Sequence, residues 1–267
     1  MIDVLQVVFL ALLQGLTEFL PISSSAHLVI PSLILGWDDQ GLAFDVAVHV
    51  GTLVAVVVYY RAVLLRMAYS WFRSVAGAPA TADSRMVWYL GLATIPAGLV
   101  GILAGGFIEG NLRTIPVIAT TTLIFGLLLG FADRRVAGTG SGKPLGLLMA
   151  LVIGSAQALA PIPGVSRSGI TMTAALLLGM DRQSSAQFSF LLSIPIISSA
   201  GLLKAWELGS SPQVVDWFSL SLGVLVSGVA AYLCIDVFLR LLDRMGLMPF
   251  VYYRIALAAL LYFLWLA

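Results

Sequence analysis

Residues 14–27 read QGLTEFLPISSSAH, a polar stretch with a central proline and apolar sequence on both sides. The apolar segment that leads into it, residues 4–17, is shorter than the roughly 20 residues that a membrane-spanning helix needs. The segment that follows, residues 28–35, is shorter still. Two short helices around a polar break predict a re-entrant hairpin, because irregular backbone at membrane depth must be satisfied by protein or by a wet cavity.

A second break of the same kind lies in the other half of the chain. The apolar residues 145–160 end at Pro161 and Pro163, the polar sequence GVSRSG follows over residues 164–169, and residues 170–180 form another short apolar segment. This layout predicts a second re-entrant hairpin.

Three longer apolar segments follow each hairpin, and these six predict transmembrane helices: residues 43–60, 86–107, 115–131, 188–203, 218–239 and 251–267. The chain therefore reads as an internal repeat, about 1–135 and 140–267, within a single integral membrane domain covering residues 1–267. A shift of 140 residues lays Pro21 on Pro161. Because three spans is an odd number, we expect the repeats to have inverted topology.

Composition supports an all-α membrane protein. Hydrophobic residues make up 60% of the 267 residues and charged residues only 10%, against about 25% in soluble domains. Lipid is the solvent that suits such a surface. The net charge of +1 argues neither for nor against nucleic acid, but the sequence has no basic patch with interleaved aromatic residues, so no nucleic-acid partner is expected. The single Cys234 excludes an internal disulfide framework.

The distribution of Lys and Arg predicts the topology. With six spans, two cations, Arg113 and Lys204, fall on one side of the membrane. Eleven fall on the other: Arg61, Arg66, Arg73, Arg85, Arg134, Arg135, Lys143, Arg182, Arg240, Arg244 and Arg254. The positive-inside rule assigns the eleven to the cytoplasm. Both termini are then expected outside it, with the first hairpin entering from outside and the second from inside.

Ionisable and hydroxyl groups gather in the first break. Gln14 and Glu18 are four residues apart and share a helix face. A carboxylate at membrane depth is costly and indicates a functional site. Three hydroxyls, those of Ser23, Ser24 and Ser25, follow, and His27 adds a group that can titrate near neutral pH.

The second break has the composition of an anion site. Gly164, Ser166 and Ser168 stand where a turn opens a helix, and such a turn exposes backbone N–H groups. Arg167 adds a planar fork that matches phosphate oxygens, and Thr171 lies one helical turn further on the same face. A base with hydroxyls in one break and an oxyanion clamp in the other predict phosphoryl transfer.

The runs QGLTEFLPISSSAH and PGVSRSGIT resemble the two signature motifs of the bacterial undecaprenyl-diphosphatase family, the bacitracin-resistance type, and the resemblance covers essentially the whole chain. It implies a multi-pass enzyme of the bacterial inner membrane. Such an enzyme hydrolyses undecaprenyl diphosphate and recycles the lipid carrier for peptidoglycan synthesis. The family allows Glu or Gln at the position of Gln14, so a second carboxylate is not essential here.

The resemblance also implies roles for residues. Catalytic roles fall to Glu18, Ser24, His27 and Arg167. Substrate-binding roles fall to Gln14, Ser23, Ser25, Gly164, Ser166, Ser168 and Thr171. A divalent cation, Mg²⁺ or Ca²⁺, is associated with the family's activity, and Glu18 is the candidate ligand. Ser24 is the candidate nucleophile, with either His27 or Glu18 handling the proton, and attack by water or by His27 itself stays open.

Other functions fit parts of the pattern. A polyprenyl-phosphate transporter or flippase would suit inverted repeats with broken helices, but transport alone needs no Ser–His–Glu grouping opposite an arginine. An intramembrane protease could use Ser24 and His27, yet peptide hydrolysis has less need of Arg167. A zinc enzyme is disfavoured, because the chain has two histidines, one cysteine and no HExxH motif.

Several residues outside the motifs are expected to be structural. His49 is expected to be a packing histidine, and Asp236 with Arg240 an interfacial ion pair. Asp38, Asp39 and Asp45 read as a solvated outer edge. Two GxxxG pairs, Gly101 with Gly105 and Gly126 with Gly130, could serve either a homodimer or packing within one chain.

Overall fold

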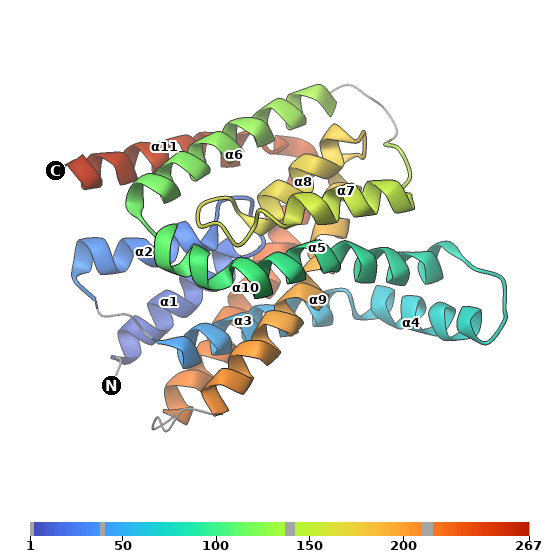
Figure 1. Ribbon diagram of the computed structural model, residues 1–267, viewed down its shortest axis with the longest axis horizontal. Coiled ribbons are helices and arrows are strands. Elements are labelled where there is room, and N and C mark those ends of the chain that lie inside the picture. The colour runs from blue at the N-terminus through green and yellow to red at the C-terminus, as the bar shows by residue number, and fades with distance from the viewer. Residues whose placement is uncertain (1–2, 38–40, 137–141, 210–215, 267) are drawn as a thin grey trace.

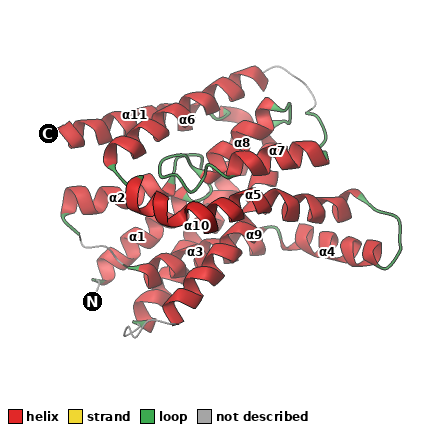
Figure 2. Ribbon diagram, viewed as in Figure 1, coloured by secondary structure: helices red, strands yellow, loops and turns green. Residues whose placement is uncertain are grey.

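The computed structural model describes residues 3–37, 41–136, 142–209 and 216–266, and within these ranges every regular element is an α-helix (Figures 1 and 2). The helices, in chain order, are α1 (Val4–Thr17), α2 (Ser24–Leu35), α3 (Leu42–Tyr59), α4 (Arg61–Val75), α5 (Ala82–Asn111), α6 (Ile115–Val136), α7 (Leu147–Gln157), α8 (Arg167–Leu177), α9 (Arg182–Gly209), α10 (Trp217–Met245) and α11 (Met248–Leu266). Asp38, Asp39 and Ala267, on which sequence expectations also fall, lie outside the described residues.

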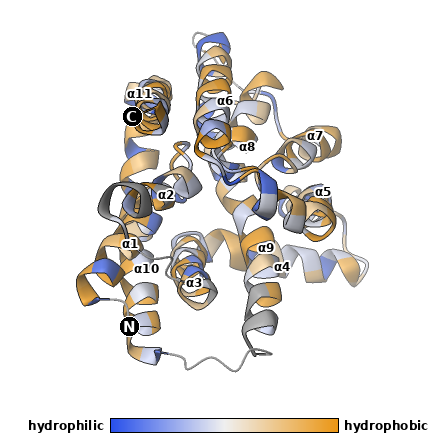
Figure 3. Cartoon of the chain, turned by 60° about the vertical axis from the view of Figure 1, so that its left-hand side comes forward, coloured by the Kyte–Doolittle hydropathy of each residue, from blue (hydrophilic) through white to orange (hydrophobic). Residues whose placement is uncertain are grey.

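The predicted spans are confirmed as helices α3, α5, α6, α9, α10 and α11. In the described part of the chain five of these are by themselves long and apolar enough to cross a membrane, and α3 qualifies together with α4, to which it is joined at a bend of 75°. Large apolar side chains on the outer surfaces are highly exposed, among them Leu99, Ile102 and Leu103 of α5. Hydrophobic residues are frequent along the helices (orange in Figure 3). Such a surface suits contact with lipid.

One helix was not expected. The stretch after the first span, predicted as a cationic connection, contains α4, which packs beside α5 (Figure 1). A search for apolar runs misses this helix because it is amphipathic. Its polar and apolar residues lie on different faces of the helix and are therefore interspersed along the sequence.

The two predicted hairpins are confirmed as α1 with α2 and α7 with α8, each a pair of short helices around an irregular break. Their breaks share a local geometry. Ser23 and Ser166, which precede α2 and α8, have φ of +73° and +70°, the only positive values among the non-glycine residues described. Each hydroxyl lies beside that of the serine two residues on, at 3.1 Å from Ser25 and 3.2 Å from Ser168.

This geometry corrects the register of the repeat. The shift of 140 residues, based on Pro21 and Pro161, does not superpose equivalent positions, because Ser23 corresponds in conformation to Ser166, a shift of 143 residues. The same shift relates Gln14 to Gln157, and both side chains are fully buried.

Small residues allow close helix contacts around α10. A Cβ atom added to Gly15 of α1 would lie 2.5 Å from the backbone oxygen of Ser227, and one added to Gly51 of α3 would collide with the Ser227 side chain. Close approach of backbones through glycine is the usual way that helices pack in lipid. These contacts hold the first hairpin and the first span against α10.

The two GxxxG pairs differ in whether they pack against another helix of the chain. Cβ atoms on Gly126 and Gly130 of α6 would lie 3.0 Å from Arg254 and 3.1 Å from Val251, so this pair packs against α11. Around Gly101 and Gly105 of α5 a Cβ atom would meet nothing within 4 Å. The pair on α6 therefore serves packing within the chain.

The charge pattern needs one correction. Arg254, counted among the cytoplasmic cations, is 0% exposed and lies within α11. Without Arg254, ten cations lie on the predicted cytoplasmic side and two on the opposite side. This distribution still favours termini outside the cytoplasm, and the topology stays a prediction. The expected pair of Asp236 and Arg240 is confirmed at 2.7 Å.

Candidate active site

The two breaks meet at the centre of the helix assembly, where the loop after α1 lies beside the loop after α7 (Figures 1 and 2). The Gly164 N–H donates to the Ser25 hydroxyl at 3.3 Å, and the Ser168 hydroxyl donates to the Leu20 carbonyl at 2.9 Å. Residues about 140 positions apart in the chain thus form one site.

Glu18 is the centre of this site. The Gln14 amide donates to Glu18 Oε2 at 2.9 Å, so the predicted contact along one helix face is present. The Ser24 hydroxyl donates to the same oxygen at 3.1 Å. Arg167, from the opposite break, reaches Oε1 with Nη2 at 3.4 Å. The carboxylate is therefore placed both to accept a proton from Ser24 and to orient Arg167.

The Arg167 guanidinium is held by several groups. Its Nη1 donates to the Ser189 carbonyl at 3.0 Å, and its Cζ lies 5.8 Å from the centre of the Phe19 ring. Its Nε is buried and has no hydrogen-bond partner in the described structure. A buried donor without a partner is costly, and an anionic ligand would satisfy it.

Thr171 lies behind Arg167. Its hydroxyl donates to the Arg167 carbonyl at 2.9 Å and lies 2.7 Å from the Ser189 hydroxyl. Ser166 accepts from the Gly169 N–H at 3.1 Å and thereby caps α8. These contacts orient the start of α8, so Thr171 and Ser166 support the helix that carries Arg167.

His27 bonds to the first break and to α11. Its Nδ1 donates to the Ser23 carbonyl at 2.7 Å, because a carbonyl can only accept, and its Nε2 lies 2.6 Å from the Tyr253 hydroxyl. The two rings are stacked at 5.5 Å. In the neutral imidazole Nε2 accepts from Tyr253. The structure brings Glu18, Ser24 and Arg167 together, and His27 joins the first break to α11.

His49, which was expected to be a packing histidine, lies at the edge of the site. Its Nε2 lies 4.0 Å from Glu18 Oε2, and 37% of its side chain is exposed. Its Nδ1 donates to the Asp45 carbonyl at 2.7 Å. The sequence signal was weak, because an isolated histidine in an apolar helix has no motif around it.

Arg254 is the other residue that the sequence analysis misplaced. Its guanidinium donates to the Pro21 carbonyl at 3.2 Å, the Gly164 carbonyl at 2.9 Å, the Val165 carbonyl at 3.1 and 3.2 Å, and the Thr122 carbonyl at 3.0 Å. It therefore joins both breaks and α6. The sequence did offer one indication of this role. Arg254 lies within the predicted span 251–267, and a cation inside a span usually has a specific partner or function.

A metal centre made of protein ligands alone is not found in the described ranges, where no three His, Cys, Asp or Glu side chains come together. The site offers one carboxylate, that of Glu18. Mg²⁺ is commonly held by one or two carboxylates together with substrate phosphates. The donor set thus fits a divalent cation only if a diphosphate supplies most of the oxygens.

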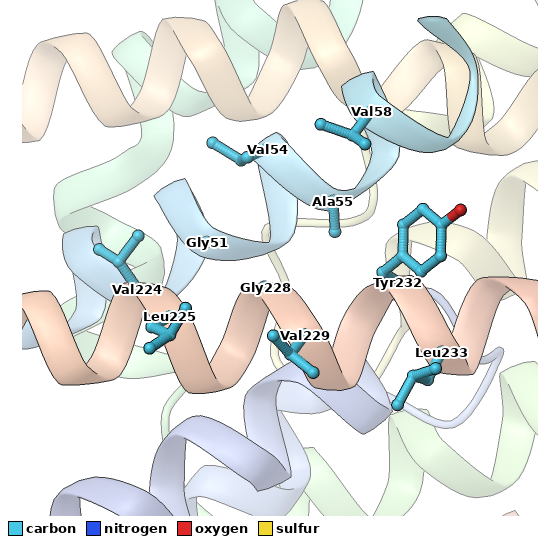
Figure 4. Close-up of a pocket in the computed structure, with 10 residues that line it drawn as sticks. All are labelled: Gly51, Val54, Ala55, Val58, Val224, Leu225, Gly228, Val229, Tyr232 and Leu233. Carbon is cyan, nitrogen blue, oxygen red and sulfur yellow. The ribbon is translucent and has the colours of Figure 1, made fainter.

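A groove of about 330 Å³ lies apart from the polar site, between α3 and α10 (Figure 4). Its lining is apolar except for the Tyr232 hydroxyl, and it includes Gly51, Val54, Val58, Gly228 and Val229. It contains none of the residues that contact Glu18.

These features define a polytopic α-helical membrane protein with a buried carboxylate–serine–arginine site at two paired re-entrant breaks. Residues 7–260 match the family model described as bacitracin resistance protein BacA, and the chain belongs to this family. It is 54% identical over 255 residues to undecaprenyl-diphosphatase 1 of Pseudoalteromonas translucida, covering 96% of each chain. It is 56% identical to the undecaprenyl-diphosphatase of Colwellia psychrerythraea, covering 97% of this chain and 98% of the relative.

Proposed function

We propose that this protein hydrolyses undecaprenyl diphosphate to undecaprenyl phosphate and inorganic phosphate, recycling the lipid carrier for peptidoglycan synthesis. The observation that carries the proposal is the Ser24–Glu18 pair facing Arg167 from the opposite break. Family membership and relatives named undecaprenyl-diphosphatases, aligned over nearly their full length, support the same reaction. The flippase alternative receives no comparable support, since transport does not require a base beside a serine.

The geometry supports Ser24 as the nucleophile and Glu18 as its base. The hydroxyl already donates to the carboxylate, so Glu18 can take the proton as Ser24 Oγ bonds to the terminal phosphorus. The bond from that phosphorus to the bridging oxygen breaks, Glu18 passes its proton to the leaving group or to solvent, and undecaprenyl phosphate leaves. Water then attacks the phosphoserine and gives a proton to Glu18. The bond between phosphorus and Ser24 Oγ breaks, Glu18 returns this proton to Ser24 Oγ, and inorganic phosphate is released.

Arg167 would hold the terminal phosphate. Its unpartnered Nε and its Nη groups supply a planar set of donors that matches phosphate oxygens, and the low-dielectric surroundings strengthen their attraction to the developing charge. Gln14 would keep Glu18 in place. We also propose that a bound Mg²⁺ or Ca²⁺ would neutralise part of the diphosphate charge, with Glu18 as its protein ligand.

The proposal includes the location of the enzyme and its orientation in the membrane. We place it in the bacterial inner membrane with both termini outside the cytoplasm, which the ten-to-two distribution of cations supports. The undecaprenyl chain would lie in the bilayer or in a hydrophobic groove. A homodimer would have Gly101 and Gly105 available as a contact, because a Cβ atom at either position would meet nothing within 4 Å.

Phosphate release from undecaprenyl diphosphate by the purified protein tests the proposal. Ser24→Ala and Arg167→Ala should each lose nearly all turnover. Ser199→Ala and Arg240→Ala are matched controls, because Ser199 bonds only within α9 and Arg240 pairs with Asp236 on an exposed surface. Both controls should keep turnover. Absence of phosphate release by the wild type, with or without Mg²⁺ or Ca²⁺, would overturn the hydrolase assignment.

A further inference from the structure

Helix α4 departs from the direction of α3. It begins directly after α3 and turns away from it by 75°. α4 packs beside α5 (Figure 1). Met67 of α4 is buried, and most of the other side chains of this helix are exposed or partly exposed.

An exposed apolar stripe runs along α4. Leu65, Tyr69, Phe72 and Val75 are between 61% and 71% exposed. Leu65, Tyr69 and Phe72 follow the spacing i, i+4, i+7, which places them on one face of the helix. Contiguous apolar surface of this kind indicates contact with a membrane or with a partner.

Arginines line one edge of this stripe. Arg66 and Arg73 are seven residues apart and therefore lie on the same flank of the helix, one position from Leu65 and from Phe72 in sequence. The Arg73 guanidinium lies 5.7 Å from the centre of the Tyr69 ring. The Arg66 contact with Asp83 is long, at 4.0 Å, and both side chains are exposed. Both guanidiniums thus remain accessible to an anion.

We propose that α4 is an interfacial helix that binds the anionic phospholipids of the leaflet it faces. Its apolar stripe enters the boundary between headgroups and acyl chains, and Arg66 and Arg73 contact lipid phosphates from the edge of the stripe. An amphipathic helix with aromatic residues on one face and arginines beside them matches this arrangement. The positive charge favours anionic over zwitterionic lipid.

Lipid selectivity tests the proposal on the full chain. The protein is extracted from membranes containing phosphatidylglycerol and phosphatidylethanolamine, and the retained lipids are counted by mass spectrometry. Arg66→Gln/Arg73→Gln should lose enrichment in phosphatidylglycerol by about fivefold for each arginine, the usual effect of a cation near an anionic surface. The control is Arg134→Gln/Arg135→Gln, which removes the same charge from the exposed end of α6. Undiminished enrichment in the α4 variant overturns the proposal.

The depth of the stripe is measured separately. A nitroxide on Tyr69→Cys in a Cys234→Ala background should be accessible to oxygen and shielded from a water-soluble nickel reagent once the protein is in lipid nanodiscs. Access to nickel equal to that of an aqueous label would overturn the proposal and favour a protein partner. The melting temperature in detergent serves as the folding control for every variant, so this test does not depend on the hydrolase activity.

Discussion

Arg254→Lys should disable the site from a distance. The guanidinium makes five hydrogen bonds, from three nitrogens, to carbonyls of both breaks and of α6. A lysine has three donors on one nitrogen, so at least two of these bonds are lost. At about 1.5–3 kcal/mol for each bond to a charged group, the loss is about 3–6 kcal/mol. Folded proteins are typically stable by only about 5–15 kcal/mol.

Two measurements assess this variant, thermal unfolding in detergent and phosphate release per folded molecule. We expect a clear fall in melting temperature and a larger fall in turnover, because Arg254 connects the break that carries Ser24 with the break that carries Arg167. Arg244→Lys, an exposed cation on α10, should change neither quantity. Gly126→Ala should have an intermediate effect, since its Cβ would lie 3.0 Å from Arg254.

Retention of both the melting temperature and the turnover by Arg254→Lys would refute this reasoning. It would mean that the carbonyls of Pro21, Gly164 and Val165 find other donors at little cost. A loss of turnover with an unchanged melting temperature would instead show that Arg254 positions the two breaks without contributing to global stability.

Other changes test the site directly. Arg167→Lys should lower turnover about 10- to 100-fold in phosphate-release kinetics, since a point charge cannot replace a bidentate contact worth about 1.5–3 kcal/mol; near-normal turnover would contradict the clamp. Ser24→Ala should abolish acid-stable phosphate labelling and turnover, and appreciable turnover would favour water or His27 as the nucleophile. Chelation should reduce turnover reversibly if a cation assists, with Mg²⁺ or Ca²⁺ restoring it. Cysteine labelling of Arg73→Cys should occur only from the cytoplasm.

The sequence by itself determined the six spans and the two breaks. Lipid admits only backbone that is internally hydrogen-bonded, so spans and interruptions are visible as runs of apolar residues and as Pro, Gly and Ser clusters. The contact between Gln14 and Glu18 was also predictable, because four residues make one helical turn. The pairing of Glu18 with Arg167 followed less directly, from two motifs with complementary charge.

The tertiary structure decided which distant groups meet. Hydropathy treats Arg254 like any other cation near a span end, and only the packing of α11 against α6 shows that it binds both breaks. Spacing within a helix defines the face of a side chain but not the partner opposite that face. For this reason the sequence could not foresee that His49 adjoins Glu18 or that His27 bonds to Tyr253, 226 residues away.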